Sequence, residues 1–109
     1  MESIRVAGVA DIPDGSMRRV DAGGVAVLVA NVGGEFYAIA NTCSHRGGDL
    51  SKGTIQDGIV KCPRHGSKFD VRSGGSLEGP KILGKMFATG PVRAYPVKVD
   101  GEDILVGGE

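Results

Sequence analysis

Residues 41–69 read NTCSHRGGDLSKGTIQDGIVKCPRHGSKF, and the candidate metal ligands of the chain are concentrated in this stretch. It holds every cysteine and every histidine of the 109-residue chain, which has two of each. They form two couples, Cys43 with His45 and Cys62 with His65, and sixteen residues separate His45 from Cys62. Glycines follow both couples, which is typical of tight loops. Two such loops at one end of a shared scaffold would bring four ligand-type side chains to one point.

Short antiparallel strands are predicted around these loops. The candidate strands are Ser3–Val9, Val25–Ala30, Phe36–Ala40, Ile59–Val60, Phe69–Val71, Val92–Val99 and Ile104–Val106. The turn signals between them are Gly33-Gly34, Asp57-Gly58 and Asp100-Gly101. Because no segment shows a sustained helical period, we predict one all-β domain over residues 1–109. The expected architecture is an antiparallel β-sandwich with a small subdomain at about 41–69, and Leu77–Gly90 is expected to be a long loop.

The composition narrows the class of protein. Thirteen Lys and Arg offset thirteen Asp and Glu, so no bulk charge indicates nucleic-acid or membrane binding. The longest apolar run, Val25–Ala30, is too short to span a bilayer, and the N-terminus lacks the pattern of a secretory signal. We therefore expect a soluble, cytoplasmic protein. With no Trp and few aromatic residues the core is thin, and a metal centre would help to stabilise it.

Two thiolates and two imidazoles suit three kinds of site. Structural zinc usually takes two cysteines followed by two histidines, and the alternating order here fits that pattern poorly. A Cys43–Cys62 disulfide is uncommon in a cytosolic chain and leaves the histidines unexplained. In a mixed-ligand [2Fe–2S] centre, thiolates bind one iron and imidazoles the other, which uses all four side chains. The residues favour the iron–sulfur site, with zinc and the disulfide as alternatives.

The two loops resemble the paired C-x-H and C-x-x-H signature of the Rieske family. The segment C-P-R-H-G-S-K-F-D from Cys62 onward is especially similar to stand-alone Rieske ferredoxins, which supply electrons to oxygenases. The final Y-P-V-K-V-D-G-E-D-I-L-V resembles the last strands of such ferredoxins. The resemblance implies one Rieske-type [2Fe–2S] cluster per chain, in a cluster-binding subdomain at about 41–69.

Residue roles also follow from this resemblance. Cys43 and Cys62 would bind the inner iron, and His45 and His65 the outer iron. Ser67 would donate a hydrogen bond to a cluster sulfur, and Pro80 would belong to a loop that covers the cluster. The chain would be a one-electron carrier, not an enzyme by itself, and a monomer in isolation. Its partners would be a reductase as donor and an oxygenase or other acceptor. A small subunit of a reductase complex, a redox sensor and a zinc-stapled binding module are the alternatives.

Three departures from related proteins are visible. Respiratory members of the family carry a disulfide between the loops, at positions that match Gly48 and Arg64 here. Phe69 occupies the position of a tyrosine that donates to sulfur in those members. With Ser67 kept and that tyrosine lost, we expect a low to intermediate reduction potential. Residues 81–90 form an extension that the related ferredoxins lack, and its role is open.

Charged residues near the loops have two interpretations. Arg46, Lys61, Arg64 and Lys68 are most simply a solvated face. The alternative is that Arg46 and Arg64 surround an exposed tip and attract an acidic partner. Asp49, Asp70 and Glu78 have no spacing that indicates acid–base catalysis, and we assign them to the surface.

Overall fold

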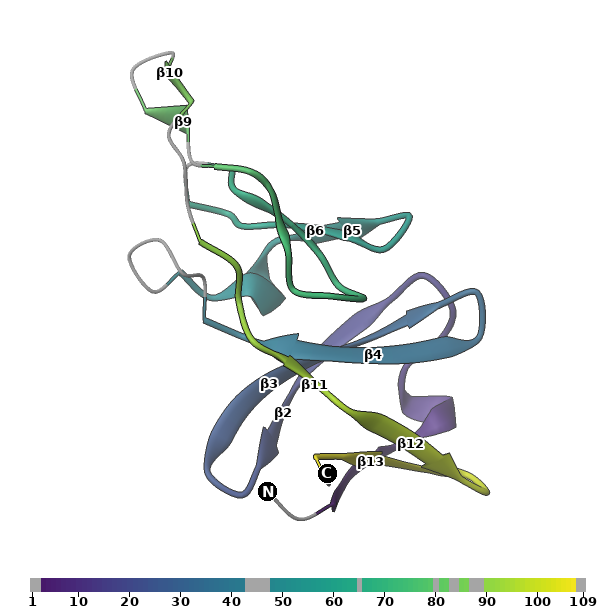
Figure 1. The fold of residues 1–109 in the computed structure, drawn as a ribbon. Coiled ribbons are helices and arrows are strands. Elements are labelled where there is room, and N and C mark those ends of the chain that lie inside the picture. Colours follow the sequence, from purple (N-terminus) through teal and green to yellow (C-terminus); the bar gives the residue numbers. More distant parts are fainter. Residues whose placement is uncertain are drawn as a thin grey trace.

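The computed structural model (Figure 1) describes residues 3–42, 48–64, 66–79, 81–82, 85–86 and 90–107. Within these ranges the chain consists of antiparallel strands and two 3-10 turns, without an α-helix. The strands form three main sheets and one two-stranded hairpin. This arrangement confirms the predicted all-β, antiparallel fold. No helix in the described ranges has the length and apolar character needed to cross a bilayer.

A four-stranded sheet lies at the centre, in the order β11-β4-β3-β2. Its strands are β2 (Met17–Ala22), β3 (Val25–Val32), β4 (Glu35–Ala40) and β11 (Ala94–Tyr95). Gly33 and Gly34 have φ of 64° and 92°, as a type I′ turn requires, so the predicted β3–β4 hairpin is confirmed. β2 was not predicted, because only Val20 and Ala22 of its side chains are buried and its apolar alternation is weak.

The base layer covers one face of this sheet (Figure 1). It consists of β1 (Ile4–Gly8), η1 (Val9–Asp11), β12 (Val97–Asp100) and β13 (Asp103–Val106), with the strands in the order β1-β13-β12. The predicted hairpin at Asp100-Gly101 is confirmed. The predicted single strand Val92–Val99 is wrong, because the chain changes sheets at Pro96. β11 pairs with β4, whereas β12 pairs with β13, and a proline lacks the N–H that a continuous ladder needs there.

The loop layer covers the other face and carries the predicted ligand loops. It consists of η2 (Leu50–Lys52), β5 (Thr54–Gln56), β6 (Ile59–Lys61), β7 (Lys68–Asp70) and β8 (Ser76–Glu78), in the strand order β5-β6-β7-β8. The turn predicted at Asp57-Gly58 is confirmed, with φ of 53° and 78°. This sheet ends at Glu78, whereas the subdomain boundary at about Phe69 stays a prediction.

The long loop predicted for Leu77–Gly90 contains strands. Leu77 and Glu78 belong to β8, which pairs with β7 through Lys68 and Glu78. β9 (Lys81–Ile82) and β10 (Lys85–Met86) form a separate two-stranded hairpin. Figure 1 shows this hairpin extending away from the loop layer.

Two cores form because the central sheet is buried on both faces. Val27 and Val29 point into the core shared with the base layer, which also contains Ile104. Leu28 packs into the core shared with the loop layer, which also contains Phe69. Successive residues of a strand face opposite sides, so a strand buried on both sides needs a continuous apolar run. This explains the sequence of β3 and confirms that it is a buried strand.

Candidate metal centre

The described ranges include two of the predicted cofactor-binding residues, Cys62 and Ser67. The other four, Cys43, His45, His65 and Pro80, lie outside the described residues, and so does Arg46. The description of the site therefore rests on the second loop and on the two ends of the first.

The second loop connects β6 to β7 and brings Cys62 and Ser67 together at its base. The backbone N–H of Cys62 donates to the carbonyl of Ser67 at 2.7 Å, and the N–H of Gly66 donates to the carbonyl of Arg64 at 2.7 Å. Gly66 has a φ of 75°, which favours glycine. Cys62 and Ser67 are each only 1% exposed, whereas Arg64 lies on the surface. The loop thus holds one thiol and one hydroxyl in a buried position at the end of the sheet.

The hydroxyl of Ser67 is the one buried side-chain oxygen or nitrogen in the described ranges that lacks a hydrogen-bond partner. Leaving such a group unsatisfied costs about 1–3 kcal/mol, so native proteins rarely do it without a reason. Cluster sulfur accepts hydrogen bonds from nearby donors. A buried hydroxyl next to Cys62 is therefore consistent with a [2Fe–2S] group in contact with this loop.

The end of the first loop packs directly against the second. A Cβ built on Gly48 would lie 2.8 Å from the Sγ of Cys62 and 3.3 Å from the Cδ of Arg64. Any side chain at position 48 would therefore collide with the thiol unless the loops moved apart. This contact was not predicted, although the resemblance had matched Gly48 and Arg64 to one bridged pair of positions. Their proximity agrees with that match.

Hydrogen bonds fix both ends of the first loop. Thr42 and Asp49 form a β-bridge, and the N–H of Leu50 donates to the carbonyl of Asn41 at 2.8 Å. The carboxylate of Asp49 accepts from Asn41 Nδ2 at 2.7 Å and from Ser51 Oγ at 2.6 Å. The hydrogen bonds from Ser51 and then Asn41 lower the pKa of Asp49. Residues 41–42 and 49–51, on either side of the first ligand couple, are therefore joined by one polar network.

The assignment of Asp49 to the surface is wrong, because this carboxylate is half-buried and structural. Asp49 caps η2 by accepting from the N–H of Ser51 at 3.1 Å. The pattern of an aspartate two residues before a serine is typical of such a cap and could have indicated this role.

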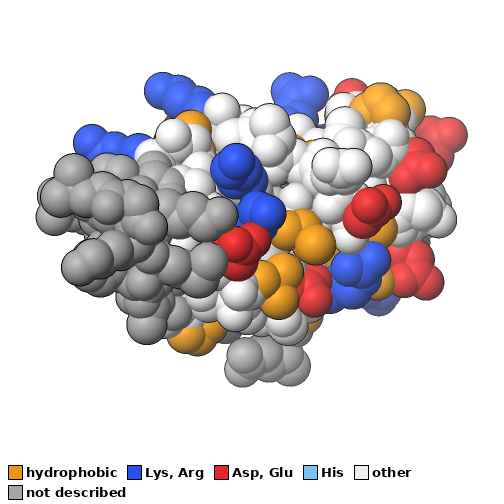
Figure 2. All heavy atoms as spheres, turned by 90° about the horizontal axis from the view of Figure 1, so that it is seen from above, with side chains coloured by type: hydrophobic (Ala, Val, Ile, Leu, Met, Phe, Trp, Pro, Cys, Tyr) orange, Lys and Arg blue, Asp and Glu red, His pale blue; other side chains and the backbone are white. Residues whose placement is uncertain are grey.

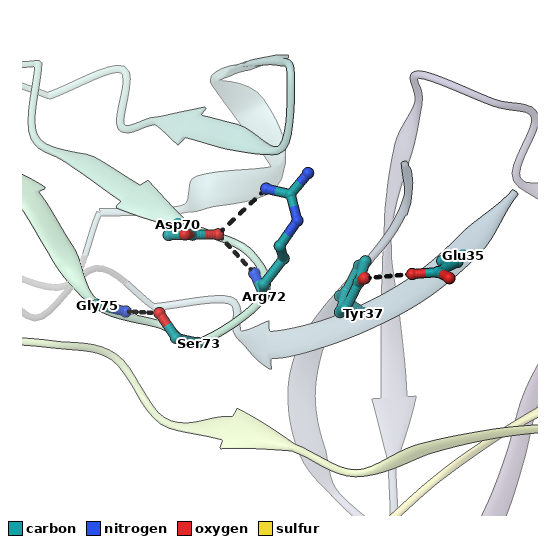
Figure 3. A network of polar contacts seen from close by, with 6 residues as sticks. All are labelled: Glu35, Tyr37, Asp70, Arg72, Ser73 and Gly75. Carbon is teal, nitrogen blue, oxygen red and sulfur yellow. Dashed lines mark hydrogen bonds and ion pairs between the residues drawn. The ribbon is translucent and has the colours of Figure 1, made fainter. Parts of the chain in front are cut away.

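Asp70 and Glu78 are also half-buried and paired. Glu78 forms an ion pair with Lys68 at 2.8 Å. Asp70 accepts from the backbone N–H of Arg72 at 2.9 Å and pairs with its guanidinium at 3.5 Å (Figure 3). The guanidinium also lies 5.7 Å from the ring centre of Tyr37 on β4, so it links the loop layer to the central sheet. These carboxylates therefore have structural partners in the described ranges.

Comparison with known proteins places this geometry in a family. The model of the Rieske [2Fe–2S] domain matches residues 2–105. The chain is 39% identical over 106 residues to the ferredoxin component of biphenyl 2,3-dioxygenase from Rhodococcus jostii (strain RHA1), which covers 97% of this chain and 92% of that protein.

Solved structures give the same result. The ferredoxin of carbazole 1,9a-dioxygenase from Nocardioides aromaticivorans IC177 has a TM-score of 0.85 and 34% identity, over 100% of both chains. A chain from a complex of reduced oxygenase and oxidized ferredoxin in carbazole 1,9a-dioxygenase has a TM-score of 0.85 and 32% identity. That match covers 98% of this chain and 94% of the other.

The family implies a Rieske-type [2Fe–2S] cluster as the cofactor, one per domain. The described part of the site fits this cofactor on two counts. Ser67 offers a buried hydroxyl without a partner within the described ranges, and the lack of a side chain at Gly48 leaves room beside the sulfur of Cys62. Matching of the family model over nearly the whole chain, together with this fit, shows that the chain belongs to the Rieske [2Fe–2S] domain family.

Proposed function

We propose that this chain is a Rieske-type ferredoxin that carries one electron at a time from a reductase to an oxygenase. The observation that carries the proposal is the buried hydroxyl of Ser67 beside Cys62, in a chain similar over its length to ferredoxin components of dioxygenases. The similar ferredoxin chain found in a complex with a reduced oxygenase supports the choice of acceptor. As a carrier, the chain has no substrate site of its own.

Four residues hold the cofactor in this proposal: Cys43 and Cys62 bind one iron, and His45 and His65 bind the other. When bound, the [2Fe–2S] cluster takes up and releases one electron. Replacing two anionic thiolates with neutral imidazoles removes negative charge from the site, which raises the reduction potential relative to an all-cysteine site. All four side chains bind iron, which leaves no ligand position for a substrate. The chain therefore passes its electron to a partner protein.

The remaining residues of the site position the loops and tune the potential. Ser67 donates a hydrogen bond to sulfur, which stabilises the reduced form because it withdraws electron density. Gly48 lets the end of the first loop approach the sulfur of Cys62, and the Asn41–Asp49–Ser51 network joins the residues on either side of that loop. Pro80 contributes to a covering loop. A cytoplasmic location and a monomeric state in isolation stay predictions.

Anaerobic purification followed by assays for iron and acid-labile sulfide tests the cofactor. We expect two irons and two sulfides per chain, and a paramagnetic signal after reduction with dithionite. Absence of iron and sulfide would contradict the proposal, and zinc in their place would favour the zinc-stapled module. Reduction by a reductase and reoxidation by an oxygenase test the two transfers separately.

Ser67→Ala tests the role of the hydroxyl. The variant should keep the cluster, because Ser67 is not a ligand, but its midpoint potential should fall. Ser76→Ala is the matched control, since Ser76 is a half-buried serine on β8 of the same sheet. Equal potentials in wild type and Ser67→Ala would show that the hydroxyl does not act on the cluster.

A further inference from the structure

Lysines gather on the outer surface of the loop layer, beside the second ligand loop. Lys61 on β6 lies directly opposite Lys68 on β7 and Thr54 on β5. Lys52, at the end of η2, joins them around a pocket of about 540 Å³. Cys62, Pro63 and Gly66 also line this pocket, whereas Gly48 and Ser67 do not. The pocket therefore adjoins the candidate metal centre from outside.

Two of the three lysines carry charge that the described residues do not neutralise. Lys61 and Lys68 face each other across the sheet, and like charges in such positions are destabilising. The charge of Lys68 is neutralised by its 2.8 Å ion pair with Glu78. Within the described ranges, neither Lys52 nor Lys61 forms an ion pair. The pKa of Asp49 is lowered mainly by hydrogen bonds from Ser51 and Asn41. The positive charge of Lys52 makes a smaller contribution in the same direction. Both lysines are exposed.

Lys61 lies close to the loop that carries the predicted ligand His65. A Cβ built on Gly66 would be 3.4 Å from the Cε of Lys61, so the lysine stem passes over the glycine at the end of that loop. A carboxylate that pairs with Lys61 would therefore sit next to the segment from Cys62 to Gly66. A partner that pairs with Lys61 would therefore lie close to the candidate metal centre, which shortens the distance for electron transfer.

Charge is distributed unevenly along the sequence, although the net charge is zero. Residues 41–90 contain eight Lys and Arg and four Asp and Glu, whereas the rest of the chain contains five and nine. Figure 2 looks down on the loop-layer end, and it shows blue side chains mainly in the left half and centre of the view and red ones mainly on the right. Such a charge distribution orients a protein as it approaches a charged partner.

We propose that Lys52, Lys61 and Lys68 form a docking surface for an acidic face of the redox partner protein. We call this set the lysine surface. The inference rests on the proposed function, because it assigns the surface through which that function is exercised. Carboxylates of the partner enter the pocket, neutralise Lys52 and Lys61, and bring the partner beside the Cys62–Gly66 segment.

Charge reversal tests the lysine surface in the holoprotein. The double variant Lys52→Glu/Lys61→Glu is compared with wild type and with Lys98→Glu/Arg18→Glu, which reverses two exposed charges outside the loop layer. Second-order rate constants for reduction by the reductase and oxidation by the oxygenase are measured from low to high salt. We expect the lysine variant to lose about ten-fold or more at low salt, and the control to stay near wild type.

Salt dependence separates docking from an altered potential. Attraction between exposed charges is screened by salt, so the rates of wild type and the lysine variant should converge at high salt. A ratio that persists at high salt would indicate a changed driving force and overturn the docking assignment. Equal losses in the lysine and control variants would assign the effect to total charge and also overturn it.

Two further outcomes keep the inference distinct from the proposed function. A wild-type holoprotein that exchanges electrons with neither partner contradicts the proposed function itself. If wild type and the lysine variant exchange electrons with both partners at equal rates, only the docking surface is contradicted. Sedimentation at low salt tests whether a second copy of the chain binds the lysine surface instead. Self-association that is lost in the lysine variant would assign the surface to that second copy and overturn the redox-partner assignment.

Discussion

The base layer and the loop layer cover opposite faces of one central sheet, yet they differ in how they are held. Base-layer strands have four or five residues and pair in long ladders, so backbone hydrogen bonds and buried side chains such as Ile104 support one another. Strands of the loop layer have three residues each, and their connections contain tight glycine contacts. Gly53 shows this tightness, because a Cβ there would overlap the carbonyl of Lys61.

This difference indicates that the two layers obtain their stability from different sources. Strands as short as three residues contribute little by themselves, so the loop layer depends on a few buried anchors, chiefly Phe69 and Leu50. Metal binding supplies further stability where a small core cannot. We therefore expect the loop layer to be sensitive to the cofactor and the base layer to be insensitive.

Removal of the cluster should have the largest effect on this contrast. After chelation of the iron, amide protection should fall steeply across residues 48–79, because the ligands no longer hold the two loops together. Protection in β3 and β13 should persist. Hydrogen exchange followed by mass spectrometry measures both regions in one sample, and a uniform loss over all strands would show that the layers are one cooperative unit.

Truncation of one anchor in each layer should sharpen the contrast. Phe69→Ala should lower the free energy of unfolding by about 3–5 kcal/mol, and Ile104→Ala by about 2–5 kcal/mol, since both side chains are fully buried. Only Phe69→Ala should also reduce the iron content, because β7 leads out of the ligand loop. Denaturant unfolding and iron assays on both variants measure these effects, and equal iron contents would contradict the expected asymmetry.

Asp49→Asn should destabilise the loop layer by about 1 kcal/mol near neutral pH. Because hydrogen bonding lowers the pKa of Asp49 below its usual 3.8, its ionised form stabilises the folded state fully above that value. This contribution is lost as the pH falls through the lowered folded-state pKa. The difference between wild type and variant in unfolding free energy should therefore shrink from pH 5.5 towards pH 3.

Asp57→Asn is the matched control for this effect. It removes the same charge from the exposed β5–β6 turn, where the φ of 53° is one that Asn adopts readily. The control should stay within about 0.5 kcal/mol of wild type. A difference that is equally large for both variants would mean that net charge, and not the Asn41–Asp49–Ser51 network, sets the stability.

Arg72→Ala should have the smallest effect, about 0.5–1 kcal/mol, because the guanidinium is partly exposed. Its contacts with Tyr37 and Asp70 connect the loop layer to the central sheet (Figure 3). A double-mutant cycle with Tyr37→Leu isolates the contact between layers. Arg93→Ala is the control, since Arg93 stacks on Tyr95 in its own segment at 5.0 Å. Additive effects of Arg72→Ala and Tyr37→Leu would show that the contact between Arg72 and Tyr37 does not stabilise the packing of the loop layer on the central sheet.

Elements with strong local signals were predictable from the sequence. The apolar run of β3 and the turns at Gly33-Gly34, Asp57-Gly58 and Asp100-Gly101 all lie where expected. β2 and β8 were missed because their pairing comes from neighbouring strands and not from their own alternation. The break at Pro96 was missed although the proline itself signals it, because a proline argues against a continuous central strand.

The site was predictable in its chemistry but not in its supporting contacts. The spacing of cysteines and histidines led to the family, and the family model confirms it. The contact of Gly48 with the sulfur of Cys62 joins two loops that are far apart in the sequence, so no local pattern reveals it. The assignment of individual ligands stays a prediction, because three of the four lie outside the described residues.

Pairing of the first strand with the last has a consequence for biosynthesis. Ile4 in β1 lies opposite Val106 in β13. A nascent chain therefore exposes both ligand loops before β13 has left the ribosome, while β1 still lacks its neighbour. Iron–sulfur assembly during translation would act on a half-built sandwich, whereas assembly after release would meet a finished one.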